Sequence, residues 1–149
     1  MKKKAAFLLV AAVLLLTAVL AVVHLTTREQ VETGRLVVSY QNKQQEVVFT
    51  QLPLQQIQGT ISNAKGQTFP VDAKGLSAEA FLAELNITGF SKMTVVADDE
   101  YRAEVSAAEI EAENVVAFII QEDGGVQMVV FPDSNSKRNV TNVIRVEVS

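Results

Sequence analysis

A short basic stretch near the C-terminal end has residue types that could bind an anion. Lys137, Arg138 and Asn139 are adjacent, and together an ammonium, a guanidinium and an amide offer several N–H donors to a phosphate or carboxylate. The loop that contains them, residues 133–139, follows Pro132, which cannot donate to a strand ladder. A loop held between two strands is a common place for binding groups. The alternative is a solvated turn whose charges keep a strand edge soluble.

Other groups that could do chemistry are sparse. Ser62 and Asn63 fall in a predicted hairpin, and residues 98–100 (Asp-Asp-Glu) lack the alternating ligands and the glycine of a calcium loop, which favours a plain acidic turn. The chain has no cysteine, which excludes disulfides, thiolate metal sites and cysteine nucleophiles. Its one histidine, His24, lies in the N-terminal segment, so we expect no Ser-His-Asp catalytic set.

The first quarter of the chain predicts a membrane segment. Residues 1–4 are Met-Lys-Lys-Lys, and the nineteen residues 5–23 include one polar member, Thr17. Such a run is long enough to span a bilayer as a helix, and the leading lysines predict a cytoplasmic N-terminus. We therefore expect a single-pass cell-membrane protein whose signal-anchor helix leaves the rest outside the cytoplasm. The alternative is a secretory signal cleaved after Ala21, which would make the protein secreted.

The remainder of the chain predicts a linker over residues 24–34 and one domain over residues 35–149. From Arg35 onward there are nine Lys or Arg and fifteen Asp or Glu, a net charge of −6. An acidic domain is a poor binder of nucleic acid, because the phosphate backbone selects for positive charge. We therefore expect no nucleic-acid partner.

The pattern of this domain predicts an α+β fold with mostly antiparallel sheets, one main helix and one short helix. The main helix is expected to begin at Ser77, whose hydroxyl can cap it. The short helix is expected to begin at Ser106, with Glu109 completing a capping box. The expected strands lie at residues 35–40, 46–50, 57–62, 67–71, 93–97, 101–105, 115–120, 128–131 and 144–148.

Three of these strands differ in character. Residues 115–120 and 128–131 are continuous apolar runs, which predicts strands covered on both faces. Asp123-Gly124 between them is a strong hairpin signal. Residues 144–148 alternate between apolar and charged side chains, which predicts a half-solvated strand at the edge of a sheet.

Several segments, in this order, resemble the molybdopterin-binding domain of sulfite-oxidase-type oxidoreductases. The resemblance covers about residues 57–148 and rests on the order of several weakly specific motifs. They are Lys74-Gly75-Leu76-Ser77 leading into Phe81-Leu82, similar to that family's G-V-x-L-x-x-L-L segment; Val95 to Tyr101 with Ser106-Ala107-Ala108-Glu109-Ile110; Met128 to Pro132; Ser136-Lys137-Arg138-Asn139-Val140; and Ile144-Arg145-Val146-Glu147-Val148.

The resemblance implies the fold but not the chemistry. Catalytic members of the family bind molybdenum through a cysteine at the position that matches Ser62 or Asn63 here, and a hydroxyl or amide is a poor replacement for a soft thiolate. Molybdopterin is the family cofactor, and we expect no cofactor and no metal to be bound by this chain. If an anion or a pterin is bound, the resemblance implies a site made of Ser62, Tyr101, Lys137, Arg138 and Asn139.

Three functions follow as hypotheses. The first is a membrane-tethered, extracytoplasmic binding or interaction module without a catalytic residue of its own, with a possible protein partner in the cell envelope. The alternative is an accessory oxidoreductase or a pterin- or anion-binding protein that uses the C-terminal basic loop. The third is a structural partner of a membrane complex, in which the helix over residues 5–23 supplies part of the contact.

Overall fold

The computed structural model describes residues 2–27, 34–131 and 136–149, with side chains omitted at residues 2–9, 24–27 and 136. The chain divides into two compact units, Met1–Val31 and Glu32–Ser149. Every buried apolar side chain that the structure describes lies in the second unit. The Glu32–Ser149 unit therefore has a hydrophobic core of its own and is expected to fold without the first unit. Residues 28–33 of the predicted linker, residues 24–34, are outside the described residues.

The first unit contains one helix, α1 (Lys2–Thr27). Across the residues that are described, no helix is both long enough and apolar enough to cross a membrane. This finding contradicts the transmembrane signal-anchor helix predicted over residues 5–23.

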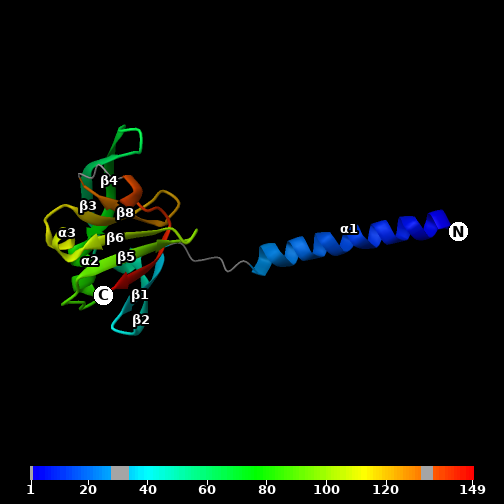
Figure 1. Ribbon diagram of the computed structural model, residues 1–149, viewed down its shortest axis with the longest axis horizontal. Helices are drawn as coiled ribbons and strands as arrows, with labels where there is room; N and C mark the ends of the chain where they lie inside the picture. The colour runs from blue at the N-terminus through cyan, green and yellow to red at the C-terminus, as the bar shows by residue number, and fades with distance from the viewer. Residues whose placement is uncertain (1, 28–33, 132–135) are drawn as a thin grey trace. The chain divides into compact units, whose positions relative to one another are not determined.

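The second unit consists of two sheets (Figure 1). Sheet A has the strand order β2-β1-β9-β5-β6, and sheet B has the order β3-β4-β7-β8. The pairing is antiparallel except between β1 and β9, which are parallel. The strands are β1 (Arg35–Tyr40), β2 (Lys43–Val48), β3 (Gln55–Ser62), β4 (Thr68–Ser77), β5 (Lys92–Ala97), β6 (Arg102–Ser106), β7 (Val116–Ile120), β8 (Val126–Val130) and β9 (Val143–Val148).

The unit is mostly β, so the predicted α+β class is wrong. Its helices are α2 (Ala78–Glu84), α3 (Ala107–Glu111) and two short 3-10 turns, η1 (Phe49–Gln51) and η2 (Ser136–Arg138). The helix expected to be the main one has only seven residues. It ends just before Asn86, which adopts a positive φ of 55°, the left-handed conformation that commonly terminates a helix.

Both predicted helix starts are confirmed. Ser77 Oγ accepts a hydrogen bond of 3.1 Å from Ala80 N at the start of α2. At α3, Glu109 N donates to Ser106 Oγ while Ser106 N donates to Glu109 Oε2, which is a complete capping box. These contacts were predictable because they join residues only three positions apart.

The main core lies between the inner faces of the two sheets and α2. At its centre three phenylalanine rings meet: the centroids of Phe81 and Phe118 are 4.9 Å apart, and Phe49 is 5.9 Å from Phe81. The three come from η1, α2 and β7. Burying large rings is worth several kcal/mol each, so this trio fixes the helix against sheet B.

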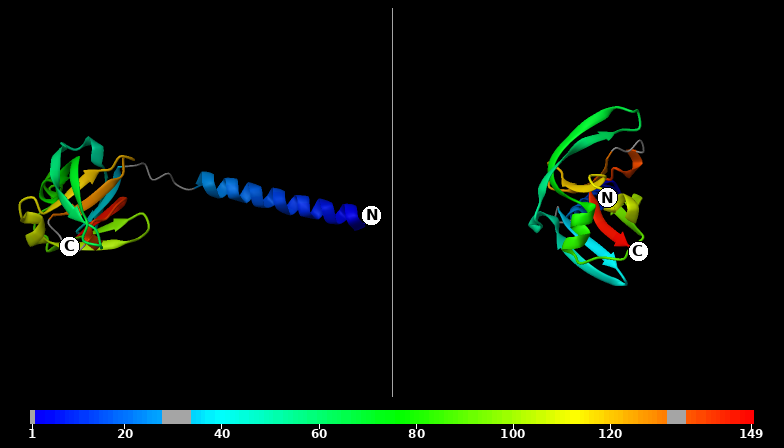
Figure 2. Two further views of the ribbon diagram at one scale, coloured as in Figure 1. Left: turned by 90° about the horizontal axis from the view of Figure 1, so that it is seen from above. Right: turned by 90° about the vertical axis from the view of Figure 1, so that its left-hand side faces the viewer.

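The outer face of sheet B is also apolar and is covered by its own hairpin. Figure 2 shows the β3–β4 hairpin arching beyond the rest of the sheets. A second buried cluster lies on this face, with partly buried hairpin residues packed against it; its buried members are Val71, Ala117, Ile119, Val129 and Phe131. The hairpin backbone lies close to the Phe131 side chain, because a Cβ added at Gly59 would lie 2.7 Å from the Phe131 ring. The prediction that β7 and β8 are covered on both faces is therefore confirmed.

The outer face of sheet A is covered by charged side chains instead. Thr94 and Val96 on β5 are 6% and 1% exposed, although their side chains lie on the outer face. Their cross-strand neighbours include Arg102, Glu104 and Glu147, whose aliphatic stems can cover apolar surface while their charged ends stay in water.

β9 lies between β1 and β5 in the middle of sheet A, so the prediction of an edge strand is wrong. Its outward residues Arg145 and Glu147 alternate with buried ones, as the sequence suggested. They are half-buried because they lie among the ion pairs Arg102–Glu147 and Arg145–Glu147. A charged face on a central strand has the same sequence pattern as an edge strand facing water.

Candidate functional site

Four of the five predicted site residues lie close together around the basic loop, residues 137–139. The Tyr101 hydroxyl donates to the Lys137 carbonyl oxygen at 2.8 Å. Asn139 Oδ1 accepts from Val130 N at 3.0 Å. Each bond fixes the loop to a different part of the domain, the turn before β6 and the end of β8, so the loop is held in place. Residues 132–135 of the predicted loop lie outside the described residues.

The Arg138 guanidinium is engaged by a carboxylate. Arg138 Nη1 donates to Glu109 Oε1 at 2.6 Å, and both side chains are mostly buried, at 25% and 32% exposed. The pKa of Glu109 is held below its usual value by the Ser106 backbone N–H and then by Arg138. A single carboxylate thus caps α3 and neutralises the loop's arginine, and an anion would have to compete with it.

One donor in the basic loop stays unsatisfied. Asn139 Nδ2 is buried, and none of the described residues provides it with a hydrogen-bond partner. A buried polar group without a partner is unusual, because it gives up water without compensation. It is the one feature of this cluster that suggests a missing acceptor. The fifth predicted residue, Ser62, pairs with Thr68 at the far end of the β3–β4 hairpin, and no described hydrogen bond joins it to the other four.

The residues of this region fit a molybdopterin poorly. The position that the resemblance assigns to the metal ligand is Ser62 or Asn63, and a hydroxyl or an amide is a poor replacement for the family's soft thiolate. Of the two cations expected to hold the cofactor's phosphate, Lys137 and Arg138, the second is already paired with Glu109. Among the described residues, no cluster of three or more His, Cys, Asp or Glu side chains could hold a metal ion.

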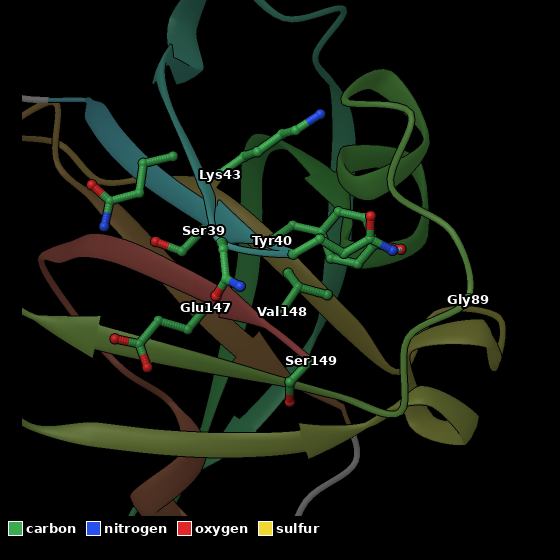
Figure 3. A pocket seen from close by; sticks show the side chains of 10 residues that line it. Ser39, Tyr40, Lys43, Gly89, Glu147, Val148 and Ser149 are labelled. Atoms are coloured by element: carbon green, nitrogen blue, oxygen red, sulfur yellow. Dashed lines mark hydrogen bonds between the residues drawn. The ribbon is translucent and has the colours of Figure 1, made fainter.

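A second candidate site lies where the parallel strands β1 and β9 end together. An open hollow of about 620 Å³ is lined there by three segments that are far apart in the sequence: residues 39–44, Gly89 and residues 147–149 (Figure 3). We call it the strand-end hollow. The turn of its first segment has positive φ at Gln41 (49°) and Asn42 (61°), the angles of the type I′ turn that suits a two-residue hairpin loop.

Hydrogen bonds hold the walls of the hollow. The Tyr40 hydroxyl donates to the Thr88 carbonyl oxygen and accepts from Gln41 Nε2 at 3.0 Å. The Ser149 carbonyl oxygen accepts from Ser91 N at 2.7 Å, which ties the end of β9 to the start of β5. A hollow with fixed walls can bind a ligand without a large loss of conformational entropy in the protein, which favours affinity.

The strand-end hollow is lined mainly by residues with polar side chains, although apolar atoms make up the larger part of its exposed surface. Hydroxyls and amides come from serine, tyrosine, asparagine and glutamine side chains: Ser39, Tyr40, Gln41, Asn42, Gln44 and Ser149. One ammonium side chain, Lys43, and one carboxylate side chain, Glu147, lie beside them, and Gly89 and Val148 complete the lining. In Figure 3 Lys43 and Glu147 extend in different directions rather than toward each other. The arrangement offers many hydrogen bonds and two separated charges, which suits recognition of a polar molecule.

The sequence did not point to this hollow. Its segments meet only because β1 pairs with β9 in parallel, a long-range pairing that leaves no local pattern. The sole local signal is the polar run at residues 41–45, between the first two predicted strands.

No protein-family model matches this chain. No curated protein matches it either.

Proposed function

We propose that the Glu32–Ser149 unit is a binding module that holds a small polar ligand in the strand-end hollow. The observation that supports this most directly is the hollow itself. Its volume of about 620 Å³ falls within the roughly 300–1,000 Å³ of small-molecule sites. Its lining joins three distant segments, so the site depends on the fold of the whole unit.

The ligand class follows from the lining. Amide and hydroxyl side chains can donate and accept, so they match a ligand that carries several hydroxyl or amide groups. The two charged residues, Lys43 and Glu147, have opposite signs, which favours a neutral or zwitterionic ligand over a polyanion. The net charge of −6 from Arg35 onward also repels polyanions at long range. A saccharide unit that carries amide groups has this chemistry.

Binding without reaction fits the lining better than catalysis does. General acid–base catalysis needs a proton donor or acceptor positioned against the substrate. Among the residues that line the hollow, the one carboxylate side chain is Glu147, and it already pairs with Arg102 and Arg145. The location outside the cytoplasm and the envelope partner stay predictions; amide-bearing saccharides of that compartment would suit the hollow.

A thermal melt of residues 32–149 with a panel of ligands tests the proposal. The panel contains amino sugars, short peptides, nucleotides and pterins. A ligand that binds only the folded state adds about 2.7 kcal/mol at a hundredfold excess over its dissociation constant. We expect an amino sugar or a peptide to raise Tm, and the double variant Lys43→Ala/Gln44→Ala to abolish the rise.

The matched control is Lys65→Ala/Gln55→Ala, which removes an exposed lysine and an exposed glutamine from the β3–β4 hairpin. It is expected to keep the full rise in Tm. A panel without any rise, or a rise that survives Lys43→Ala/Gln44→Ala, would contradict a site in the hollow.

A second candidate function is anion or pterin binding at the basic loop. The unpartnered Asn139 Nδ2 favours it, because an acceptor atom of a ligand could satisfy that donor. This function predicts a rise in Tm with a phosphorylated pterin that is lost in Lys137→Ala/Arg138→Ala. An unchanged rise in that variant would remove the loop from consideration.

A further inference from the structure

The four sheet edges of the Glu32–Ser149 unit are protected to different degrees. In sheet A, the edge strands are β2, which carries Lys43 and Glu46, and β6, which carries Arg102 and Glu104. Charged side chains of this kind discourage another strand from pairing. In sheet B, the edge strand β8 is partly covered, because Met128 exchanges two backbone hydrogen bonds with Val140, of 2.8 and 3.0 Å.

The remaining edge strand, β3, has none of these protections. Its eight residues are Gln-Gln-Ile-Gln-Gly-Thr-Ile-Ser, without a charge or a proline. Its pairing with β4 runs from Gln55 to Ser62 without a bulge. No described strand pairs with its other edge. A long, uncharged and regular edge strand is a template for another strand.

The two faces at this edge differ in chemistry. Ile57, Gly59 and Ile61 lie on the apolar face of the hairpin, together with Phe69, which is opposite Ile61 and 48% exposed. The polar face carries exposed Gln58 and Thr60 at the edge, and on β4 behind them the Asp72 carboxylate accepts hydrogen bonds from the Gln56 and Gln58 side chains. A strand that pairs here must therefore place apolar side chains on one face and uncharged polar side chains on the other.

β3 itself has that pattern. When two β3 strands run antiparallel with Gly59 facing Gly59, Ile57 of each copy faces Ile61 of the other, and Gln58 faces Thr60. Both isoleucines then form cross-strand pairs. No like charges face each other, which favours the pairing because like charges directly opposite destabilise a strand pair. The arrangement is a closed twofold one.

We propose that two copies of this chain pair along β3 in this register, so that their four-stranded sheets continue across the interface as one sheet. This interface is separate from the strand-end hollow and does not depend on the proposed ligand. A single strand edge buries less surface than the roughly 2,000 Å² or more of a permanent dimer, so the pairing is reversible and depends on concentration.

Sedimentation velocity of residues 32–149 over a range of concentrations tests the pairing. This unit contains the described core, and a cooperative melt checks its folding. We expect the average mass to rise from monomer toward dimer with concentration. A monomer at every concentration up to the limit of solubility would overturn the proposal.

Two double variants test the register. Gln58→Lys/Thr60→Lys places like charges opposite each other twice, and we expect it to raise the dimer Kd at least tenfold. Gln58→Lys/Thr60→Glu places opposite charges together twice, and we expect its Kd to stay within threefold of the wild type or to fall. Equal effects of the two variants would overturn the register.

Net charge alone predicts the reverse order. The double lysine variant makes the unit less acidic, which weakens the long-range repulsion between copies, while the lysine–glutamate variant leaves the net charge unchanged. Hydrogen exchange gives an independent measurement that needs no variant. Backbone amides of β3 should gain protection as concentration rises, while those of β2 and β6 should not; protection gained elsewhere, or nowhere, would contradict pairing along β3.

Discussion

The outer faces of sheets A and B are covered in different ways. On sheet A, charged side chains lie over Thr94 and Val96 and pair with one another across the strands. On sheet B, the chain itself folds back, and the β3–β4 hairpin packs on Val129 and Phe131. The first cover consists of side chains that face water, and the second is an extension of the apolar core.

The difference has a consequence for the strand edges. The two edge strands of sheet A, β2 and β6, carry members of its ion pairs. The same charged residues therefore cover the outer face of the sheet and discourage another strand from pairing at its edges. The hairpin of sheet B covers apolar surface with its apolar face, and its charged side chains Asp72 and Lys74 lie on β4, not on the edge strand β3. Its own edge, β3, is therefore left without charge, and this is where we propose that a second copy pairs.

The largest expected effect is on the cover of sheet B. Phe131→Ala removes a ring that is 8% exposed and should lower the free energy of unfolding by about 3–4 kcal/mol. The loss has two causes, because the variant buries less apolar surface and leaves a cavity where the ring was. Phe69→Ala is the control, since its ring is 48% exposed; we expect a loss of about 1 kcal/mol or less. Urea unfolding of residues 32–149 measures both changes. Equal losses in the free energy of unfolding would contradict the view that Phe131 belongs to the buried cover of sheet B and Phe69 to its exposed margin.

The next effect concerns the close approach of the hairpin. Gly59→Ala puts a methyl group 2.7 Å from the Phe131 ring and should cost about 1–3 kcal/mol through overpacking. Adding Phe131→Leu should relieve part of this cost, so the two changes should not be additive. Additive losses in a double-mutant cycle would mean that the hairpin does not press on this ring.

A charge pair that is partly buried should matter more than one in water. Glu109→Gln keeps a capping side chain but removes the charge that faces Arg138, and should cost about 1 kcal/mol at pH 7. The folded-state pKa of Glu109 is lowered from its ordinary 4.5, so its contribution is complete above 4.5 and is lost as pH falls through the lowered pKa.

The free energies of unfolding of Glu109→Gln and the wild type should therefore converge below pH 4.5. Urea titrations at several pH values measure this difference. A gap that stays constant down to the acid transition would show that the charge is not the cause.

The smallest effect is expected on the face of sheet A. Lys92 and Glu104 are 3.1 Å apart, but their side chains are 50% and 59% exposed. Exposed pairs contribute roughly 0–1 kcal/mol, so Lys92→Ala should change the free energy of unfolding by about 0.5 kcal/mol or less, with little left in 0.5 M salt. If Lys92→Ala lowered the free energy of unfolding as much as Phe131→Ala, the charged cover of sheet A would contribute as much stability as the apolar cover of sheet B, contrary to this account.

The sequence predicted features that depend on near neighbours. The caps at Ser77 and Ser106 were found because the partners lie three residues away. The burial of β7 and β8 was found because consecutive residues of these strands, which point to opposite faces of the sheet, are apolar. The transmembrane helix and the α+β class were wrong. The helix that begins at Ser77 has only seven residues, and strands make up most of the rest of the described unit.

Features that depend on distant partners were missed. β9 alternates like an edge strand, and only its pairing with both β1 and β5 shows that it is central. The basic loop was found, but its carboxylate partner, Glu109, is a long-range contact. The strand-end hollow needs residues 39–44 and 147–149 to meet, and no period or motif in the sequence reports that.

The most direct test of the proposed function is an amide NMR titration of residues 32–149 with the ligand that gives the largest rise in Tm. This measurement locates a ligand without presupposing where it binds. The proposal predicts saturable shifts concentrated at residues 39–44, Gly89 and Val148. Shifts concentrated at residues 136–140, or the absence of saturable shifts at the strand-end hollow, would contradict it.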